Sequence, residues 1–133
     1  MLKHIPAILT PDLLKILMEM GYGDEIVIAD GNFPAATLAQ RLVRLDGHSV
    51  PEVLRAVMQF FPLDAYTKEP VALMEVVLGD PAAPEPERCH FEFVERFAFY
   101  ERAKRAYAVI ATGETEIYAN ILLKKGVVLP EVA

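Results

Sequence analysis

The segment from Glu25 to Asp30, EIVIAD, constrains the fold of this chain more than any other. Its unbroken apolar run, Ile26 to Ala29, is typical of a strand that is buried on both faces. Sheets made of such strands need helices above and below them, as in α/β domains. Asp30 follows the strand directly, and open α/β sheets commonly bind ligands at the carboxyl ends of their strands. The segment therefore predicts a covered sheet with a carboxylate at a candidate site.

Helical and strand patterns alternate along the rest of the chain. Thr10-Pro11-Asp12 predicts a helix start, because threonine caps free amides and proline is tolerated in the first turn, with Gly21 as the stop. Ser49 and Glu52 form a capping box for another helix, which should end near Phe61. The other expected elements are a short helix and strand within 35–45, strands at 71–78, 90–95 and 120–128, and a helix from Phe97 to a stop at Gly113.

This alternation predicts a single layered α/β domain that covers residues 1–133. A chain of this length suits one compact core, and 53% of its residues are hydrophobic. The segment 79–87 holds three prolines and is the one obvious loop. It is not expected to divide two domains, since the roughly 45 residues after it would make a marginal core by themselves.

Charge and apolar run length exclude several classes of partner. The formal net charge of −6 argues against a nucleic-acid partner, because phosphate binding needs a concentrated basic surface. Apolar runs such as Val71–Met74 are far shorter than the ~20 residues of a membrane span. Cys89 is the only cysteine, so no intrachain disulfide can form. We therefore expect a soluble cytoplasmic protein without a membrane partner.

No cofactor or metal is expected. Gly21 and Gly23 follow a helix instead of opening one after a strand, so they do not form a phosphate-binding turn. The histidines His4, His48 and His90 lack the spacing of metal ligands. For each of them an ordinary surface or hydrogen-bonded role is the favoured interpretation.

The stretch from Arg96 to Gly126 carries side chains that suit a sugar. Tyr118 and Asn120 form a Tyr-x-Asn pair at the mouth of an apolar strand. Sugar hydroxyls donate and accept hydrogen bonds, and phenols and carboxamides do the same. Other roles stay open, because tyrosines are often amphipathic core residues and Asp30 alone would be as consistent with a capping carboxylate.

Six sequence fragments occur in one order and span nearly the whole chain: Leu13-Leu14, Gly21-x-Gly23-Asp24-Glu25, Asp30-x-x-Phe33-Pro34, Pro62-Leu63-Asp64-x-Tyr66, Arg96-Phe97-x-Phe99-Tyr100-Glu101-Arg102 and Leu122-Leu123-Lys124-Lys125-Gly126. Together these fragments give the chain a specific resemblance to the L-fucose mutarotase and D-ribose pyranase family, closer to the fucose branch.

This resemblance implies an α/β/α domain with a central mixed, mostly parallel sheet, and a metal-free isomerase that interconverts the anomers or ring forms of a free monosaccharide such as L-fucose. It also implies a homo-oligomer, commonly a decamer, with each site near a subunit boundary. The implied catalytic residues are Tyr22 and Asp64, and the implied substrate-binding residues are Asp30, Met74, Arg96, Tyr100, Tyr118 and Asn120. For Met74, plain core packing in an apolar strand is an equal alternative.

Tyr22 departs from the family pattern, which has its main proton donor, a histidine, at this position. The tyrosine pKa near 10 suits proton transfer at neutral pH less well than the histidine value of ~6.5. Three hypotheses follow: Tyr22 is a slower acid, a group such as Asp64 carries both proton transfers through water, or the protein binds a monosaccharide with little or no catalysis. An unrelated small-molecule or interaction role is the remaining alternative.

Overall fold

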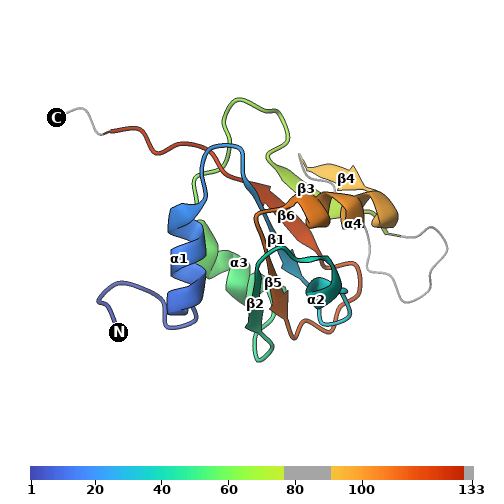
Figure 1. The fold of residues 1–133 in the computed structure, drawn as a ribbon, viewed down its shortest axis with the longest axis horizontal. Coiled ribbons are helices and arrows are strands. Elements are labelled where there is room, and N and C mark those ends of the chain that lie inside the picture. The colour runs from blue at the N-terminus through green and yellow to red at the C-terminus, as the bar shows by residue number, and fades with distance from the viewer. Residues whose placement is uncertain (77–90, 131–133) are drawn as a thin grey trace.

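The computed structural model describes residues 1–76 and 91–130, which form a three-layered α/β structure (Figure 1). The longest helix has 10 residues, and no helix in these two ranges is long and apolar enough to cross a membrane. The helices are α1 (Pro11–Glu19), α2 (Ala35–Leu38), α3 (Val50–Met58) and α4 (Arg96–Arg105). The strands are β1 (Glu25–Ala29), β2 (Leu42–Leu45), β3 (Val71–Met74), β4 (Glu92–Val94), β5 (Ala108–Thr112) and β6 (Ile121–Lys124).

The strands form one six-stranded sheet in the order β2-β5-β1-β6-β3-β4. Strand β5 pairs in parallel with β2 and β1, and β3 pairs in parallel with β4. Only β6 runs against its neighbours, β1 and β3. The predicted mixed, mostly parallel sheet is therefore confirmed. Because β6 is reversed, the residues just before it lie beside the carboxyl ends of β1 and β3.

Both faces of the sheet are covered, as the apolar sequence of β1 requires. Ile26 and Ile28 pack with α1 and α3, and Val27 and Ala29 pack with α2 and α4 on the other face. All four side chains are fully buried. Alternate residues of a strand point to opposite faces, so a strand with apolar groups on both sides stabilises both layers.

The predicted helix starts at Thr10 and Ser49 are confirmed. The Thr10 hydroxyl accepts a hydrogen bond from the Leu13 amide at 3.2 Å. The Ser49 hydroxyl accepts from the Glu52 amide at 3.3 Å and donates to the Glu52 carboxylate at 3.2 Å. Each hydroxyl satisfies an amide that has no partner inside its helix.

The expected helix from Phe97 to Gly113 is wrong in its second half. Helix α4 ends at Arg105, and Ala108–Thr112 forms β5 between β2 and β1. The two interpretations compete because small and branched apolar residues at this spacing fit both patterns, and pairing on two sides in the sheet overrides helical periodicity. All five residues of β5 are buried.

Other expected elements are shorter than predicted. The expected strand 71–78 ends at Met74 within the described residues, and it lies between β6 and the edge strand β4. The strands expected at 90–95 and 120–128 are observed at Glu92–Val94 and Ile121–Lys124. The loop 79–87, Cys89 and His90 lie outside the described residues.

Candidate functional site

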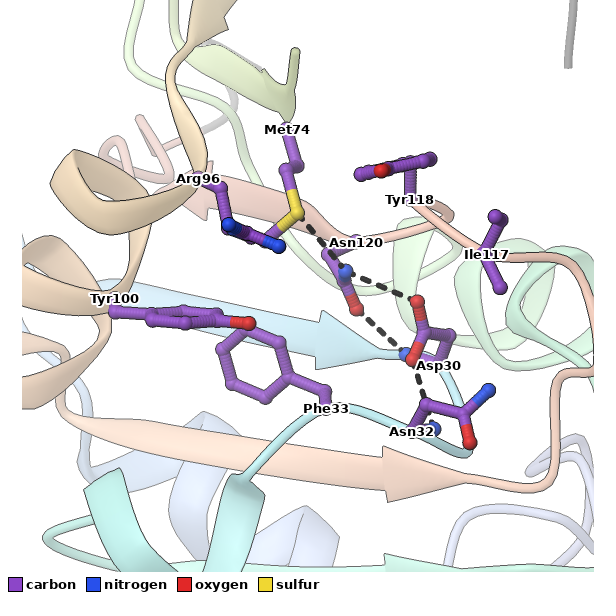
Figure 2. A pocket seen from close by; sticks show the side chains of 9 residues that line it. All are labelled: Asp30, Asn32, Phe33, Met74, Arg96, Tyr100, Ile117, Tyr118 and Asn120. Carbon is purple, nitrogen blue, oxygen red and sulfur yellow. Dashed lines mark hydrogen bonds between the residues drawn. The ribbon is translucent and has the colours of Figure 1, made fainter. Parts of the chain in front are cut away.

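A pocket of about 180 Å³ lies at the carboxyl edge of β1 and β3 (Figure 2). A few polar groups and a larger set of apolar and aromatic groups line it, which is the usual composition of a small-molecule site. The lining residues are Asp30, Asn32, Phe33, Met74, Arg96, Tyr100, Ile117, Tyr118 and Asn120.

The sheet topology explains why residues that are distant in sequence meet here. Asp30 follows the last residue of β1, and Met74 is the last residue of β3. Asn120 precedes the reversed strand β6, so it lies at the same edge. Arg96 and Tyr100 are one turn apart on α4, which begins where β4 ends. Four segments of the chain therefore supply one pocket.

Asp30 and Asn120 are joined by two hydrogen bonds. The Asn120 Oδ1 accepts from the Asp30 amide at 2.7 Å, and the Asn120 Nδ2 donates to the Asp30 Oδ2 at 3.1 Å. The Asn32 amide donates to the other carboxylate oxygen, Oδ1, at 2.9 Å. Asp30 and Asn120 are only 5% and 3% exposed, so these neutral amides stabilise a buried charge.

Burial controls the acidity of Asp30. Loss of solvent raises the pKa of the Asp30 carboxyl above its ordinary value, and the hydrogen bonds from Asn32, Asn120 and Phe33 lower it in part. A carboxylate whose pKa is raised is a stronger base than an ordinary aspartate. Asp30 therefore has the properties of a group that takes a proton from a bound hydroxyl.

The start of α4 supplies a cation to the pocket. The Glu95 carboxylate caps the helix by accepting from the Phe97 and Ala98 amides at 2.9 and 3.0 Å, and this fixes the backbone at Arg96. The Arg96 guanidinium lies 4.5 Å from the centre of the Phe97 ring. Its Nε is buried and has no hydrogen-bond partner in the described part of the chain, so one polar group beside the pocket is left unsatisfied.

Aromatic side chains form the walls. The Phe33 and Tyr100 rings meet edge to face, with 5.4 Å between their centroids. Tyr118 has a positive φ of 63°, a conformation that costs energy for a residue other than glycine. In Figure 2 its ring stands over Asn120 on the side of the pocket away from Phe33.

Tyr22 and Asp64 lie at the opposite end of the strands, near the start of β1. The Tyr22 hydroxyl donates to the Asp64 Oδ1 at 3.4 Å, and the Tyr66 amide donates to the same oxygen at 2.9 Å. Lys124 Nζ lies 3.8 Å from the Asp64 Oδ2. Asp64 is 3% exposed, whereas Tyr22 is 56% exposed, so the buried carboxylate holds a phenol that faces outward.

The surroundings of Tyr22 keep its hydroxyl protonated. Partial desolvation, and then the charge and hydrogen bond of Asp64, raise the pKa of Tyr22 above its ordinary value of about 10. At neutral pH the phenol is therefore a hydrogen-bond and proton donor, but a weak acid.

The predicted site residues thus form two groups. The structure brings together all six predicted substrate-binding residues, and it places the predicted catalytic pair, Tyr22 and Asp64, elsewhere. Sequence reasoning did not select Asn32, Phe33 and Ile117 as site residues. Their positions immediately after Asp30 and before Tyr118 were the available signal. In the described ranges, no group of three or more histidine, cysteine or acidic side chains is arranged to hold a metal ion.

Comparisons with known proteins match this chain over nearly its whole length. The model of the RbsD / FucU transport protein family matches residues 3–128. An L-fucose mutarotase of Histophilus somni is 46% identical over 96% of this chain and 97% of its own length. A fucose mutarotase of Homo sapiens is 45% identical, with 95% and 94% of the two chains covered.

Solved structures give the same result. A fucose mutarotase from Streptococcus pneumoniae, solved in complex with L-fucose, superimposes with a TM-score of 0.89 at 47% identity and covers 96% of this chain and 100% of its own. Bacillus subtilis RbsD, solved with D-ribose, superimposes with a TM-score of 0.72 at 24% identity, over 97% and 100% of the two chains. The second likeness concerns the fold alone.

Proposed function

This chain belongs to the RbsD / FucU transport protein family, and from that membership we propose that it is a mutarotase that interconverts the anomers of free L-fucose or a closely related monosaccharide. The observation that carries the proposal is the buried carboxylate of Asp30 in a pocket whose polar and apolar side chains suit a monosaccharide. Relatives that match this chain over nearly their full length are named for that activity.

The pocket suits one monosaccharide. Its volume of about 180 Å³ is below the ~300 Å³ at which pockets for drug-sized molecules begin. Asp30 accepts hydrogen bonds from sugar hydroxyls, and the guanidinium of Arg96, which also lines the pocket, donates them. Phe33, Tyr100 and Ile117 offer apolar surface to the C–H face or methyl group of a deoxy sugar.

Mutarotation requires two proton movements and no change of oxidation state. A base takes the proton of the anomeric hydroxyl while the bond from C1 to the ring oxygen breaks, and the ring oxygen receives a proton. The aldehyde of the open chain rotates about the C1–C2 bond, and closure on the other face reverses both transfers. We assign the base to Asp30, because it is the carboxylate that lines the pocket and burial raises its pKa.

In this proposal, Tyr22 and Asp64 act at the pocket of a second copy of the chain. Asp64 already accepts from Tyr22 and is buried, so it orients the phenol, and the phenol is the group that points outward. We propose that Tyr22 of one copy reaches the pocket of another, where its O–H turns from Asp64 to the ring oxygen and protonates it. The phenolate takes the proton back when the ring closes. The active protein is then a homo-oligomer, and a ring of ten chains is the expectation from the family resemblance.

Tyr22 is the reason for a second candidate function. A phenol with a raised pKa gives up its proton reluctantly at neutral pH, so slow exchange, or sugar binding without exchange, is the alternative. Both alternatives use the same pocket and differ only in turnover.

Magnetisation-transfer NMR of L-fucose, with D-ribose in parallel, separates the alternatives. The rate of exchange between anomers is measured at neutral pH with and without the protein, and sugar binding is measured by titration calorimetry. Faster exchange with L-fucose supports the mutarotase. Saturable binding with exchange at the buffer rate supports the binding protein, and the absence of both effects with both sugars contradicts the proposal.

A further inference from the structure

We propose that Lys125 is a positioning residue for Tyr22: its ammonium fixes the turn 20–24, which carries the Tyr22 phenol. The catalytic role of Tyr22 rests on the proposed function, whereas the contacts of Lys125 with this turn do not. This role also accounts for the Lys124-Lys125-Gly126 part of the sequence, since none of these three residues lines the pocket.

The carboxyl end of helix α1 needs a partner from outside the helix. The last carbonyls of a helix find no amide donor within it, and α1 has no basic residue in its last turn. The Lys125 ammonium supplies donors there, because it binds the Leu17 carbonyl at 2.8 Å and the Met20 carbonyl at 2.5 Å. A cation at this position also complements the negative end of the helix dipole. A residue from near the other end of the chain therefore caps α1.

The backbone of Lys125 binds the other side of the same turn. The Gly23 amide donates to the Lys125 carbonyl at 2.9 Å, and the Lys125 amide donates to the Asp24 carbonyl at 2.8 Å. Met20 precedes Tyr22 and Gly23 follows it, so one residue binds the chain on both sides of the phenol. In Figure 1 the turn between α1 and β1 lies beside the segment that leaves β6.

The same segment also holds the loop that carries Asp64, the acceptor of the Tyr22 hydroxyl. The Asp64 amide donates to the Lys124 carbonyl at 3.0 Å. The two backbones approach so closely that a side chain at Gly126 would collide with the Leu63 carbonyl. This segment therefore lies between the turn and the Asp64 loop, and it sets the position of the phenol relative to its acceptor.

The first test needs no sugar and uses hydrogen exchange. Lys125→Met removes the ammonium, keeps most of the side-chain length and leaves the backbone hydrogen bonds of residue 125 in place. Amides in the turn 20–24 are hydrogen-bonded, so their exchange reports how often the turn opens. Mass spectrometry of the purified protein should show exchange at least about fivefold faster in the turn and unchanged in α3.

Two further variants complete this test. Lys104→Met is the matched control, because Lys104 also lies in the last turn of a helix, α4, but it pairs with Glu101 at 3.0 Å and its side chain is 52% exposed. It should leave exchange in the turn 20–24 unchanged. Lys125→Gln keeps a shorter donor, so the test can still be made if Lys125→Met does not fold, and a smaller increase is expected.

The second test uses L-fucose and a double-mutant cycle. If Lys125 acts through Tyr22, Lys125→Met should lower kcat of anomer exchange by about tenfold, with KM within about twofold of wild type. In a Tyr22→Phe background, which has no hydroxyl to position, the same substitution should change kcat by less than about twofold. A purely structural role would lower kcat by the same factor in both backgrounds.

Each outcome decides for or against the positioning role. Unchanged hydrogen exchange in the turn 20–24, or an equal increase over the whole chain, overturns it, whatever the protein does with sugars. Equal losses of kcat in the two backgrounds also overturn it. Faster hydrogen exchange confined to the turn, in a protein that does not accelerate anomer exchange even as wild type, supports the role of Lys125 and counts against the mutarotase.

Discussion

Tyr22 and Asp30 lie at opposite ends of β1, since Tyr22 precedes Glu25 and Asp30 follows Ala29. Five residues of strand alone span about 16 Å, which is too long for both side chains of one chain to act on the same monosaccharide. Each molecule therefore carries a pocket at one edge of its sheet and an outward-facing phenol at the other. This geometry is the reason why we propose a site shared between copies.

Two substitutions of Tyr22 should change the rate of anomer exchange in opposite directions. Tyr22→Phe removes the hydroxyl but keeps the ring, and we expect kcat to fall by about ten- to a hundredfold, because the ring oxygen loses its proton donor. Tyr22→His should raise kcat above wild type, since imidazole has a pKa near neutral pH. Magnetisation-transfer NMR with L-fucose measures both rates.

Tyr107→Phe is the matched control for Tyr22→Phe. The Tyr107 hydroxyl also donates to a carboxylate, that of Glu19, at 3.2 Å, and it is not among the residues that line the pocket. Tyr107→Phe should leave the rate of anomer exchange within about twofold of the wild-type rate. Equal rates for wild type and Tyr22→Phe would rule out Tyr22 as the donor.

The pKa of Asp30 predicts how stability depends on pH. Because burial raises this pKa, the folded chain holds the Asp30 proton more tightly than the unfolded chain. Asp30 therefore favours folding at low pH, and this contribution is lost as pH rises from the ordinary value of 3.8 through the raised folded value. Relative to Asp30→Asn, wild type should lose free energy of unfolding by up to about 1.4 kcal/mol per pH unit in that window.

Urea unfolding of both proteins across the acid range checks this prediction, and the use of the difference cancels the titration of the other carboxylates. If the free energy of unfolding of wild type, relative to that of Asp30→Asn, instead rises with pH, then hydrogen bonds outweigh burial in setting the pKa of Asp30.

Arg102 should stabilise the fold by linking helix α4 to two strands of the sheet. Its guanidinium donates to Glu25 on β1 at 2.7 Å and to Glu92 on β4 at 2.9 Å, and its side chain is 22% exposed. Arg102→Met should lower the free energy of unfolding by about 1–3 kcal/mol, because two carboxylates lose a partly buried partner. Denaturant unfolding measures the loss.

Arg44 provides the comparison for Arg102→Met. It makes two hydrogen bonds to Asp46, at 3.0 and 2.7 Å, but its side chain is 56% exposed. Arg44→Met should cost less than about 1 kcal/mol, since exposed ion pairs are weak. Equal losses from the two substitutions would show that burial does not make the Arg102 pair stronger.

The sequence predicts most of the fold where local signals are strong. Thr10 and Ser49 cap helices because their hydroxyls satisfy amides of their own first turns, and β1 is recognisable from its apolar run. Strand β5 was missed because Ala108–Thr112 follows a helix after only two residues and carries no turn signal. Its strand state comes from pairing with β1 and β2, which are distant in sequence.

The site could be predicted as a set of residues but not as an arrangement. Asp30 was recognisable from its place after a buried strand, and the other five predicted binding residues from the family resemblance. That Asn120 meets Asp30 depends on the reversal of β6, which no local pattern of residues encodes. That Tyr22 lies at the other edge depends likewise on the direction of β1.

The most direct measurement is anomer exchange by mixed oligomers. Asp30→Asn and Tyr22→Ala are purified separately and also coexpressed with different tags, and L-fucose exchange is followed by magnetisation transfer. If each site takes its pocket from one copy and its phenol from another, each variant alone is nearly inactive, and the mixed oligomers regain about a quarter of the wild-type rate, since that share of the sites unites two intact halves. A mixed sample no faster than the average of the two variants would contradict the shared site.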